Sequence, residues 1–180
     1  MLVQLLSDIP LERLTARAPE CNLGAYLAQI ARWAGTSNGY ARLLLALGRS
    51  YQAQPLPRMF ERGPARQCFA NAGLLALGNP SLTYVEGLAD CGILPTAHAW
   101  CVDRAGRVID PTWSNCAQAT YFGIPVQWEA LEEHLDETGY WGLLDGTIPR
   151  RLRDGCLGEF VHPDWTTDEM RELLPQCFER

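Results

Sequence analysis

The amino-acid sequence predicts an α+β fold in which a buried, cysteine-bearing helix packs on an antiparallel sheet, with further helices before it. Apolar residues recur at helical spacing through residues 11–50, and a second apolar run begins at Cys68. Strand-like segments joined by short turns follow between residues 82 and 110. Helices followed by a run of strands are typical of the α+β class.

The length and charge of the chain restrict its organisation and its partners. At 180 residues we expect a single domain over 1–180, made of an N-terminal helical region (1–62), a core (63–126) and C-terminal helices and loops (127–180). The formal net charge of −6 argues against nucleic acid as a partner, because phosphate binding needs a basic face. No apolar stretch has membrane-spanning length, so no membrane partner is expected. The sequence leaves the oligomeric state open.

The N-terminal region is predicted to contain helical segments separated by a break. Residues such as Leu23 and Leu27 place apolar side chains one turn apart. The segment 34–39, Ala-Gly-Thr-Ser-Asn-Gly, interrupts the pattern, and a leucine-rich helix then stops at Gly48. Residues 51–66 are rich in proline and glycine and are predicted to form a loop.

The core begins with the run Cys-Phe-Ala-Asn-Ala-Gly-Leu-Leu-Ala-Leu at Cys68. This run is apolar on almost every side of a helix, which predicts a buried central helix rather than a surface one. Gly-Asn-Pro at 78–80 should end it. Strands are expected over 82–88, 97–103 and 107–110.

The C-terminal region is predicted to add short helices. Trp128, Leu131 and Leu135 lie on one face of an amphipathic segment. Thr166 and Glu169 have the spacing of a capping box, so a last helix should begin there.

Cys68, His98 and Asp110 have the chemistry and the order of a cysteine acyl-transfer site. The N–H groups and dipole at a helix N-terminus favour the thiolate, and a neighbouring imidazolium does so too. The same N–H groups can bind the oxyanion of a tetrahedral intermediate. We therefore interpret the helix start at Cys68 and the two strands that carry His98 and Asp110 as parts of one candidate catalytic site.

The turn between the last two strands decides whether His98 and Asp110 can meet. With a three-residue turn at 104–106 and Gly106 in the left-handed region, His98 lies opposite Thr112. Asp110 is then diagonal to His98 on the same face, about 7 Å away between backbones. A turn one residue longer or shorter would put the two side chains on opposite faces.

Residues around the trio are candidates for support or for substrate contact. Gln67 and Asn71 are candidates for oxyanion or supporting hydrogen bonds. The candidates for substrate contact are Tyr84, Glu86, Trp100 and Trp113. Each has a structural alternative: a buried amide for Asn71, a solvated strand residue for Glu86, and core packing for the aromatic residues, Tyr121 and Phe122 included.

The seven cysteines are scattered and include no Cys-x-x-Cys pair. A structural zinc site is therefore not indicated, and no cofactor or metal is expected. Asp8 and Pro10 interrupt the first apolar run, which does not resemble a secretory signal. Seven thiols without such a signal indicate a reducing compartment, and we expect a cytoplasmic protein.

The motifs around the trio resemble those of the transglutaminase-like and papain-like cysteine acyl-transfer superfamily. Gln-Cys-Phe-x-x-Ala at 67–72 is similar to the Gln-Cys-Trp-x-x-Ala motif of transglutaminases, and papain-like peptidases have a related Cys-Trp motif. His-Ala-Trp at 98–100 and Val-Ile-Asp-Pro-Thr at 108–112 resemble the other two motifs of that core. Small uncharacterised bacterial and phage proteins share similar blocks. The resemblance spans about residues 64–125.

This resemblance implies a papain-like, transglutaminase-like core with Cys68 as nucleophile, His98 as general base and acid, and Asp110 orienting His98. The reaction it implies is acyl transfer from an amide or isopeptide of a protein or peptide. Water is favoured over an amine as acceptor. The short interval between Cys68 and His98, and the lack of an acidic cluster for calcium, differ from larger transglutaminases.

Two other functions stay open. The first is a non-enzymatic peptide-binding module on the same fold. The second is a thiol redox or acyl-carrier role with a resolving thiol such as Cys91 or Cys101.

Overall fold

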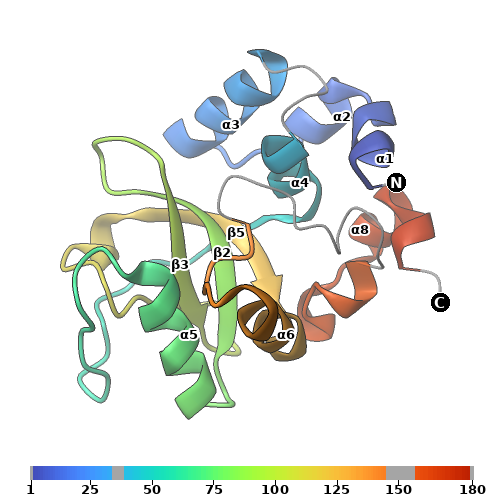
Figure 1. Cartoon of the computed structure of the whole chain (residues 1–180). Coiled ribbons are helices and arrows are strands. Elements are labelled where there is room, and N and C mark those ends of the chain that lie inside the picture. Colours follow the sequence, from blue (N-terminus) through green and yellow to red (C-terminus); the bar gives the residue numbers. More distant parts are fainter. Residues whose placement is uncertain (1, 34–38, 145–156, 179–180) are drawn as a thin grey trace.

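The computed structural model describes residues 2–33, 39–144 and 157–178 and shows an α+β chain around a five-stranded antiparallel sheet (Figure 1). The strands lie in the order β1-β5-β2-β3-β4. Their bounds are β1 Arg49–Tyr51, β2 Thr83–Asp90, β3 Thr96–Val102, β4 Val108–Ile109 and β5 Thr120–Val126. The strands β2, β3 and β4 confirm the three predicted strands to within two residues at each end.

The strands β1 and β5 were not predicted. The segment β5 contains Gly123 and Pro125, which weaken a strand pattern. Pro125 is tolerated because β1 ends before it: β1 pairs only with residues 121–123 of β5. The Pro125 carbonyl accepts a hydrogen bond from the His162 N–H instead, on the side away from β2. The N-terminal region is therefore not wholly helical, because β1 adds the edge strand.

Four helices of the N-terminal region gather at one end of the sheet (Figure 1). They are α1 Leu2–Asp8, α2 Leu11–Thr15, α3 Asn22–Trp33 and α4 Gly39–Leu47. The predicted stop at Gly48 is confirmed, whereas the predicted break at 34–39 falls mostly on residues 34–38, outside the described residues. Every residue from Ala41 to Leu47 is buried, so α4 is the centre of this group.

The helix α5 (Cys68–Gly78) packs against β3 and β2. Its small residues face the sheet: Ala72 is fully buried, and its carbonyl accepts a hydrogen bond from the Cys101 thiol at 3.2 Å. Leu74 and Leu77 point outward and are 56% and 55% exposed. The predicted burial is therefore confirmed only on the side that faces the sheet, where small residues make the contact, and is wrong for the side that carries Leu74 and Leu77.

The C-terminal region contains α6 (Trp128–Thr138), α8 (Asp168–Leu173) and several short 3₁₀ turns. The predicted amphipathic helix is confirmed as α6. The predicted cap is displaced by one residue: Thr167, and not Thr166, accepts a hydrogen bond from the Met170 N–H at 3.2 Å.

The two faces of the sheet have different covers. Tyr84, Leu88 and Ile124 face the side covered by helices and share its apolar core with them. Val85 and Trp100 face the other side, which is covered by loops that contribute partly buried aromatic residues. Among residues 2–33, 39–144 and 157–178, no helix combines the length and the apolar character needed to cross a membrane.

Arg42 joins α4 to the end of α1. Its guanidinium is buried and donates hydrogen bonds to the carbonyls of Leu6 at 2.9 Å and Ile9 at 2.5 Å. These carbonyls lie at the C-terminal end of α1, where helical partners are missing. One cation therefore satisfies several buried acceptors.

We expect Arg42→Met to lower the free energy of unfolding by about 2–3 kcal/mol, because it leaves buried carbonyls without donors. Urea denaturation followed by circular dichroism measures the change. The matched control is Arg32→Met on the exposed face of α3, which should change stability by less than about 0.5 kcal/mol. Equal losses in the two variants would contradict a structural role for Arg42.

Candidate active site

The β3–β4 hairpin has the register that the sequence predicted. Gly106 has a φ of 75°. The Asp103 N–H donates to the Arg107 carbonyl at 3.1 Å. The pairs Cys101–Ile109 and Val102–Val108 extend this register toward the site. His98 and Asp110 consequently point to the same side of the hairpin.

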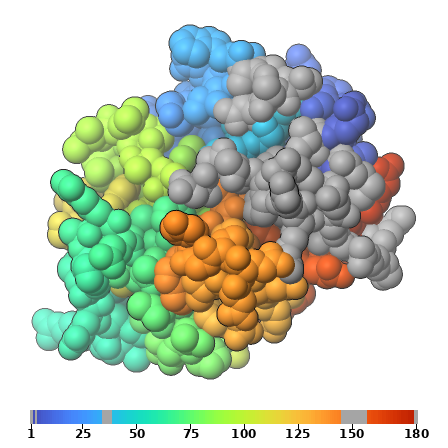
Figure 2. Space-filling view, viewed as in Figure 1, coloured from blue at the N-terminus to red at the C-terminus, as the bar shows by residue number. Residues whose placement is uncertain are grey.

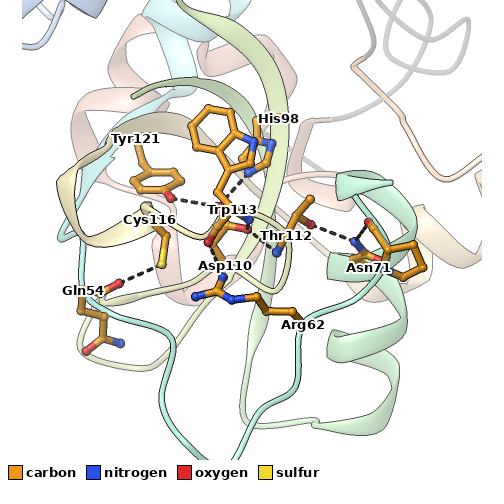
Figure 3. Close-up of polar contacts among 10 residues, drawn as sticks. Gln54, Arg62, Asn71, His98, Asp110, Thr112, Trp113, Cys116 and Tyr121 are labelled. Carbon is orange, nitrogen blue, oxygen red and sulfur yellow. Dashed lines mark hydrogen bonds and ion pairs between the residues drawn. The ribbon is translucent and has the colours of Figure 1, made fainter. Parts of the chain in front are cut away.

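Asp110 is fully buried and accepts hydrogen bonds from four donors (Figure 3). Its Oδ2 is 2.9 Å from His98 Nε2 and 2.8 Å from the Tyr121 hydroxyl. Its Oδ1 accepts the backbone N–H groups of Thr112 at 2.8 Å and Trp113 at 3.1 Å. Burial alone would raise the pKa of Asp110, but its hydrogen bonds and the charge of His98 hold that pKa below its ordinary value of 3.8. Asp110 is therefore a fixed carboxylate at neutral pH.

His98 is buried, and its ring is covered by Trp113, with the two ring centroids 4.2 Å apart. Burial alone would lower the pKa of His98, but hydrogen bonds to Asp110 and Cys68, together with their charges, raise it to about 9. Because Nε2 is bonded to Asp110, Nδ1 is the ring nitrogen left for Cys68. His98 thus holds its proton at neutral pH, between a carboxylate and a thiol.

Cys68 is the first residue of α5 and is partly exposed. The first backbone hydrogen bond of this helix joins the Asn71 N–H to the Gln67 carbonyl at 2.8 Å. The N–H groups of Cys68, Phe69 and Ala70 precede that bond and have no intrahelical acceptor. They are the donors expected at an oxyanion site.

The chain enters α5 through a strained residue. Arg66 has a φ of 66°, a left-handed conformation that is uncommon for a residue other than glycine. Such strain persists only where the surroundings fix the backbone, and it is frequent at functional sites. Here it precedes Gln67, whose exposed side chain makes no capping bond to α5.

Asn71 ties α5 to the loop that follows Asp110. Its amide nitrogen donates to the Pro64 carbonyl at 2.8 Å and to the Thr112 hydroxyl at 3.0 Å (Figure 3). The Gly63 N–H donates to the Pro111 carbonyl at 2.8 Å beside it. The segment that leads into Cys68 and the loop after Asp110 are therefore held together.

Three of the four residues expected to contact substrate lie in the interior, which corrects that expectation. Trp100 is fully buried in the apolar core beneath the hairpin. Tyr84 and Glu86 are buried on the helix-covered side, and the Tyr84 hydroxyl is 2.8 Å from Glu86 Oε1. Only Trp113 of this set is partly exposed, where it covers His98. The other three have almost no surface open to solvent.

Tyr121 is the residue whose role the sequence did not reveal. It lies on β5 and donates its hydroxyl to Asp110. Burial first, and then the charge and hydrogen bond of Asp110, raise the pKa of Tyr121, so it stays a neutral donor. A prediction of β5 would have placed Tyr121 on the same side of the sheet as Asp110.

No family model, curated protein or solved structure matches this chain. The function must therefore be argued from the geometry of the site. Within the described parts of the chain, no three His, Cys, Asp or Glu side chains converge in the way that a metal ion requires.

The raised pKa of His98 predicts a measurable titration. Two-dimensional NMR of the ring protons should give a pKa of about 9 in the wild type. In Asp110→Asn the carboxylate is lost while burial remains, so the pKa of His98 should fall by roughly two units or more. The control is Asp103→Asn, which removes a carboxylate on the same hairpin that bonds Arg107 and should leave His98 unchanged. An unaltered His98 titration in Asp110→Asn would disprove the coupling.

The raised pKa of His98 also makes the free energy of unfolding depend on pH. The pKa of His98 is higher in the folded chain than its ordinary value of 6.5, so the folded state binds the proton more tightly. This stabilisation is complete below pH 6.5 and is lost as pH rises through about 9. Urea denaturation should show that the free energy of unfolding falls by on the order of 3 kcal/mol as the pH rises through this range. The His98→Gln variant should show no such fall. A wild type and a His98→Gln variant with parallel stability curves over this range would contradict it.

Proposed function

We propose that this protein is a cysteine acyl-transfer enzyme with a papain-like, transglutaminase-like catalytic core. The observation that carries the proposal is the buried His98–Asp110 hydrogen bond of 2.9 Å, beside Cys68 at the N-terminus of α5, whose thiol contributes to the raised pKa of His98. Burial of a charged pair carries a desolvation cost, and the nearby Cys68 thiol, which contributes to the pKa of His98, is partly exposed. The order of the nucleophile helix and the two strands also agrees with that core.

The reaction follows from these positions. The Cys68 thiolate attacks an amide carbonyl, and the oxyanion accepts hydrogen bonds from the first-turn N–H groups of α5, with the Gln67 amide beside them. His98 gives its proton to the leaving amine, and the C–N bond breaks to leave a thioester on Cys68. His98 then takes a proton from water, the resulting hydroxide attacks the thioester, and Cys68 is released with a carboxylic acid. Asp110 holds the ring of His98 and stabilises its charge throughout.

Hydrolysis is proposed as the main outcome, with an amide or isopeptide of a protein or peptide as substrate. An amine in place of water would give transamidation through the same thioester. The thiol redox alternative is disfavoured for Cys101, because burial raises the pKa of its thiol and Cys101 faces α5 on the opposite side of the hairpin. Free thiols at Cys21, Cys68 and Cys91 are in keeping with a reducing, cytoplasmic setting.

We expect Cys68 to be the most reactive thiol of the folded protein. Iodoacetamide at neutral pH, followed by peptide mass spectrometry, should label Cys68 at least about tenfold faster than Cys21 or Cys91, since an adjacent imidazolium favours the thiolate. Those two cysteines are matched controls because they are also partly exposed. If all three react at the same rate, the nucleophile is misassigned and the binding module becomes the better proposal.

Turnover should depend on the whole trio. Incubation with a library of amide-containing peptides, with and without a primary alkylamine, should give acids in water and some amine adducts when the amine is present. Cys68→Ala should abolish both products, and Asp110→Asn should lower turnover roughly 100-fold or more. Asp103→Asn is the control for a lost carboxylate. Product formation by Cys68→Ala at the wild-type rate would refute acyl transfer through this thiol.

A further inference from the structure

A groove of about 490 Å³ opens beside the first turn of α5, between this helix and α6. In the space-filling view, the surface of residues 128–144 (orange) adjoins that of α5 (green) on one face of the molecule (Figure 2). The residues that line the groove come from both helices and from the segment after α6: Gln67, Phe69, Ala70, His134, Thr138, Tyr140, Trp141 and Gly142. Gln67 directly precedes Cys68, so the groove adjoins the proposed nucleophile.

The outer wall of the groove forms where the Trp141 ring packs closely against the backbone of Gly73. After α6, Tyr140 projects outward with 75% exposure, and the ring of Trp141 packs against Gly73 of α5. A Cβ atom at Gly73 would be only 2.2 Å from Cε3 of the Trp141 ring. Glycine is therefore required for the Trp141 ring to lie against α5.

A buried carboxylate fixes this wall to the sheet. Glu86 on β2 accepts hydrogen bonds from the backbone N–H groups of Leu143 at 2.8 Å and Leu144 at 2.7 Å. The Tyr84 hydroxyl, bonded to Glu86, is also 3.3 Å from the Trp141 carbonyl. Glu86 is fully buried and so holds the segment after α6 in place without touching the groove itself. This arrangement gives the groove a preformed shape.

The residues that line the groove indicate what kind of chemical group it would bind. None of the eight lining residues carries a carboxylate, ammonium or guanidinium group, and three of them are aromatic. His134 adds one polar atom, Nε2, which is buried and makes no hydrogen bond within the described part of the chain. An aromatic groove with little charge and one unused polar atom suits an apolar side chain next to an amide.

We propose that this groove binds an uncharged, apolar side chain, aromatic by preference, of the acyl donor beside the amide that Cys68 attacks. The inference rests on the proposed acyl-transfer function and deepens it by naming the substrate class. Burial of a phenyl group in a preformed apolar site corresponds to a rate advantage of about tenfold or more. Peptides with aromatic residues next to the scissile amide are therefore the preferred substrates, and peptides with acidic residues there are the poorest.

Chloroacetamides with different arms test this preference on the full-length protein. The unsubstituted compound, its N-(2-phenylethyl) derivative and its N-(2-carboxyethyl) derivative present a small, an aromatic and an anionic arm to the same thiol chemistry. Mass spectrometry of the peptides gives the second-order rate at Cys68, with Cys21 and Cys91 in the same sample as internal references. We expect the aromatic arm to react at Cys68 at least about tenfold faster than the unsubstituted compound, with no such gain at the references.

Variants separate the groove from the nucleophile. Tyr140→Ser removes an exposed ring and Trp141→Ala removes the packed one; both should lose most of the aromatic advantage while the rate with unsubstituted chloroacetamide stays within about twofold. Leu77→Ala removes an exposed apolar residue from the other end of α5 and should keep the advantage. Tyr140→Ser leaves the test available if Trp141→Ala does not fold.

The outcomes distinguish the two proposals. If Cys68 reacts no faster than the reference cysteines with the unsubstituted compound, the acyl-transfer function fails. If Cys68 is selectively reactive but shows no aromatic advantage, or prefers the anionic arm, the function stands and the groove assignment is overturned. An aromatic advantage that survives both Tyr140→Ser and Trp141→Ala also overturns it, because the arm is then bound elsewhere.

Discussion

Asp110 is the residue on which the arrangement of the site depends. A carboxylate with no exposed surface needs a donor for each of its lone pairs, and here the donors come from three separate pieces of chain. His98 comes from β3, Tyr121 from β5, and two backbone N–H groups from the loop after β4. Since each donor must reach one small group, their backbones are held in a single arrangement. The ring of His98 is consequently fixed before any substrate binds.

The close packing of α5 on the sheet is the second requirement. The residues of α5 that face inward are small, which lets the helix axis approach β3 closely enough for the Cys101 thiol to reach the Ala72 carbonyl. A larger side chain at Ala72 would move the helix outward and carry Cys68 away from His98. This contact therefore sets where the N-terminus of α5, with its unpaired N–H groups, lies relative to the sheet that carries His98.

The sequence could predict structural features that depend on one short segment of the chain. It could not predict hydrogen bonds between side chains or backbone groups of elements that lie far apart in the sequence. The β3–β4 turn needs only residues 103–107, so a glycine at the left-handed position was enough to predict the register. From the sequence, Glu86 was a candidate for substrate contact or a solvated strand residue, and Tyr121 an aromatic residue with core packing as its structural alternative. Their roles depend on Asp110 in one case and on Leu143 and Leu144 in the other. Hydrogen bonds across 57 residues leave no periodic signal.

The distribution of the donors to Asp110 has a consequence for the nascent chain. Cys68 and its helix leave the ribosome early, but Tyr121 is synthesised more than fifty residues later. Until β5 has docked beside β2, the carboxylate of Asp110 lacks one of its side-chain donors and the sheet that holds His98 is incomplete. In a partly synthesised chain, the surroundings that raise the pKa of His98 are therefore incomplete. The proposed catalytic site can form only after translation has passed β5.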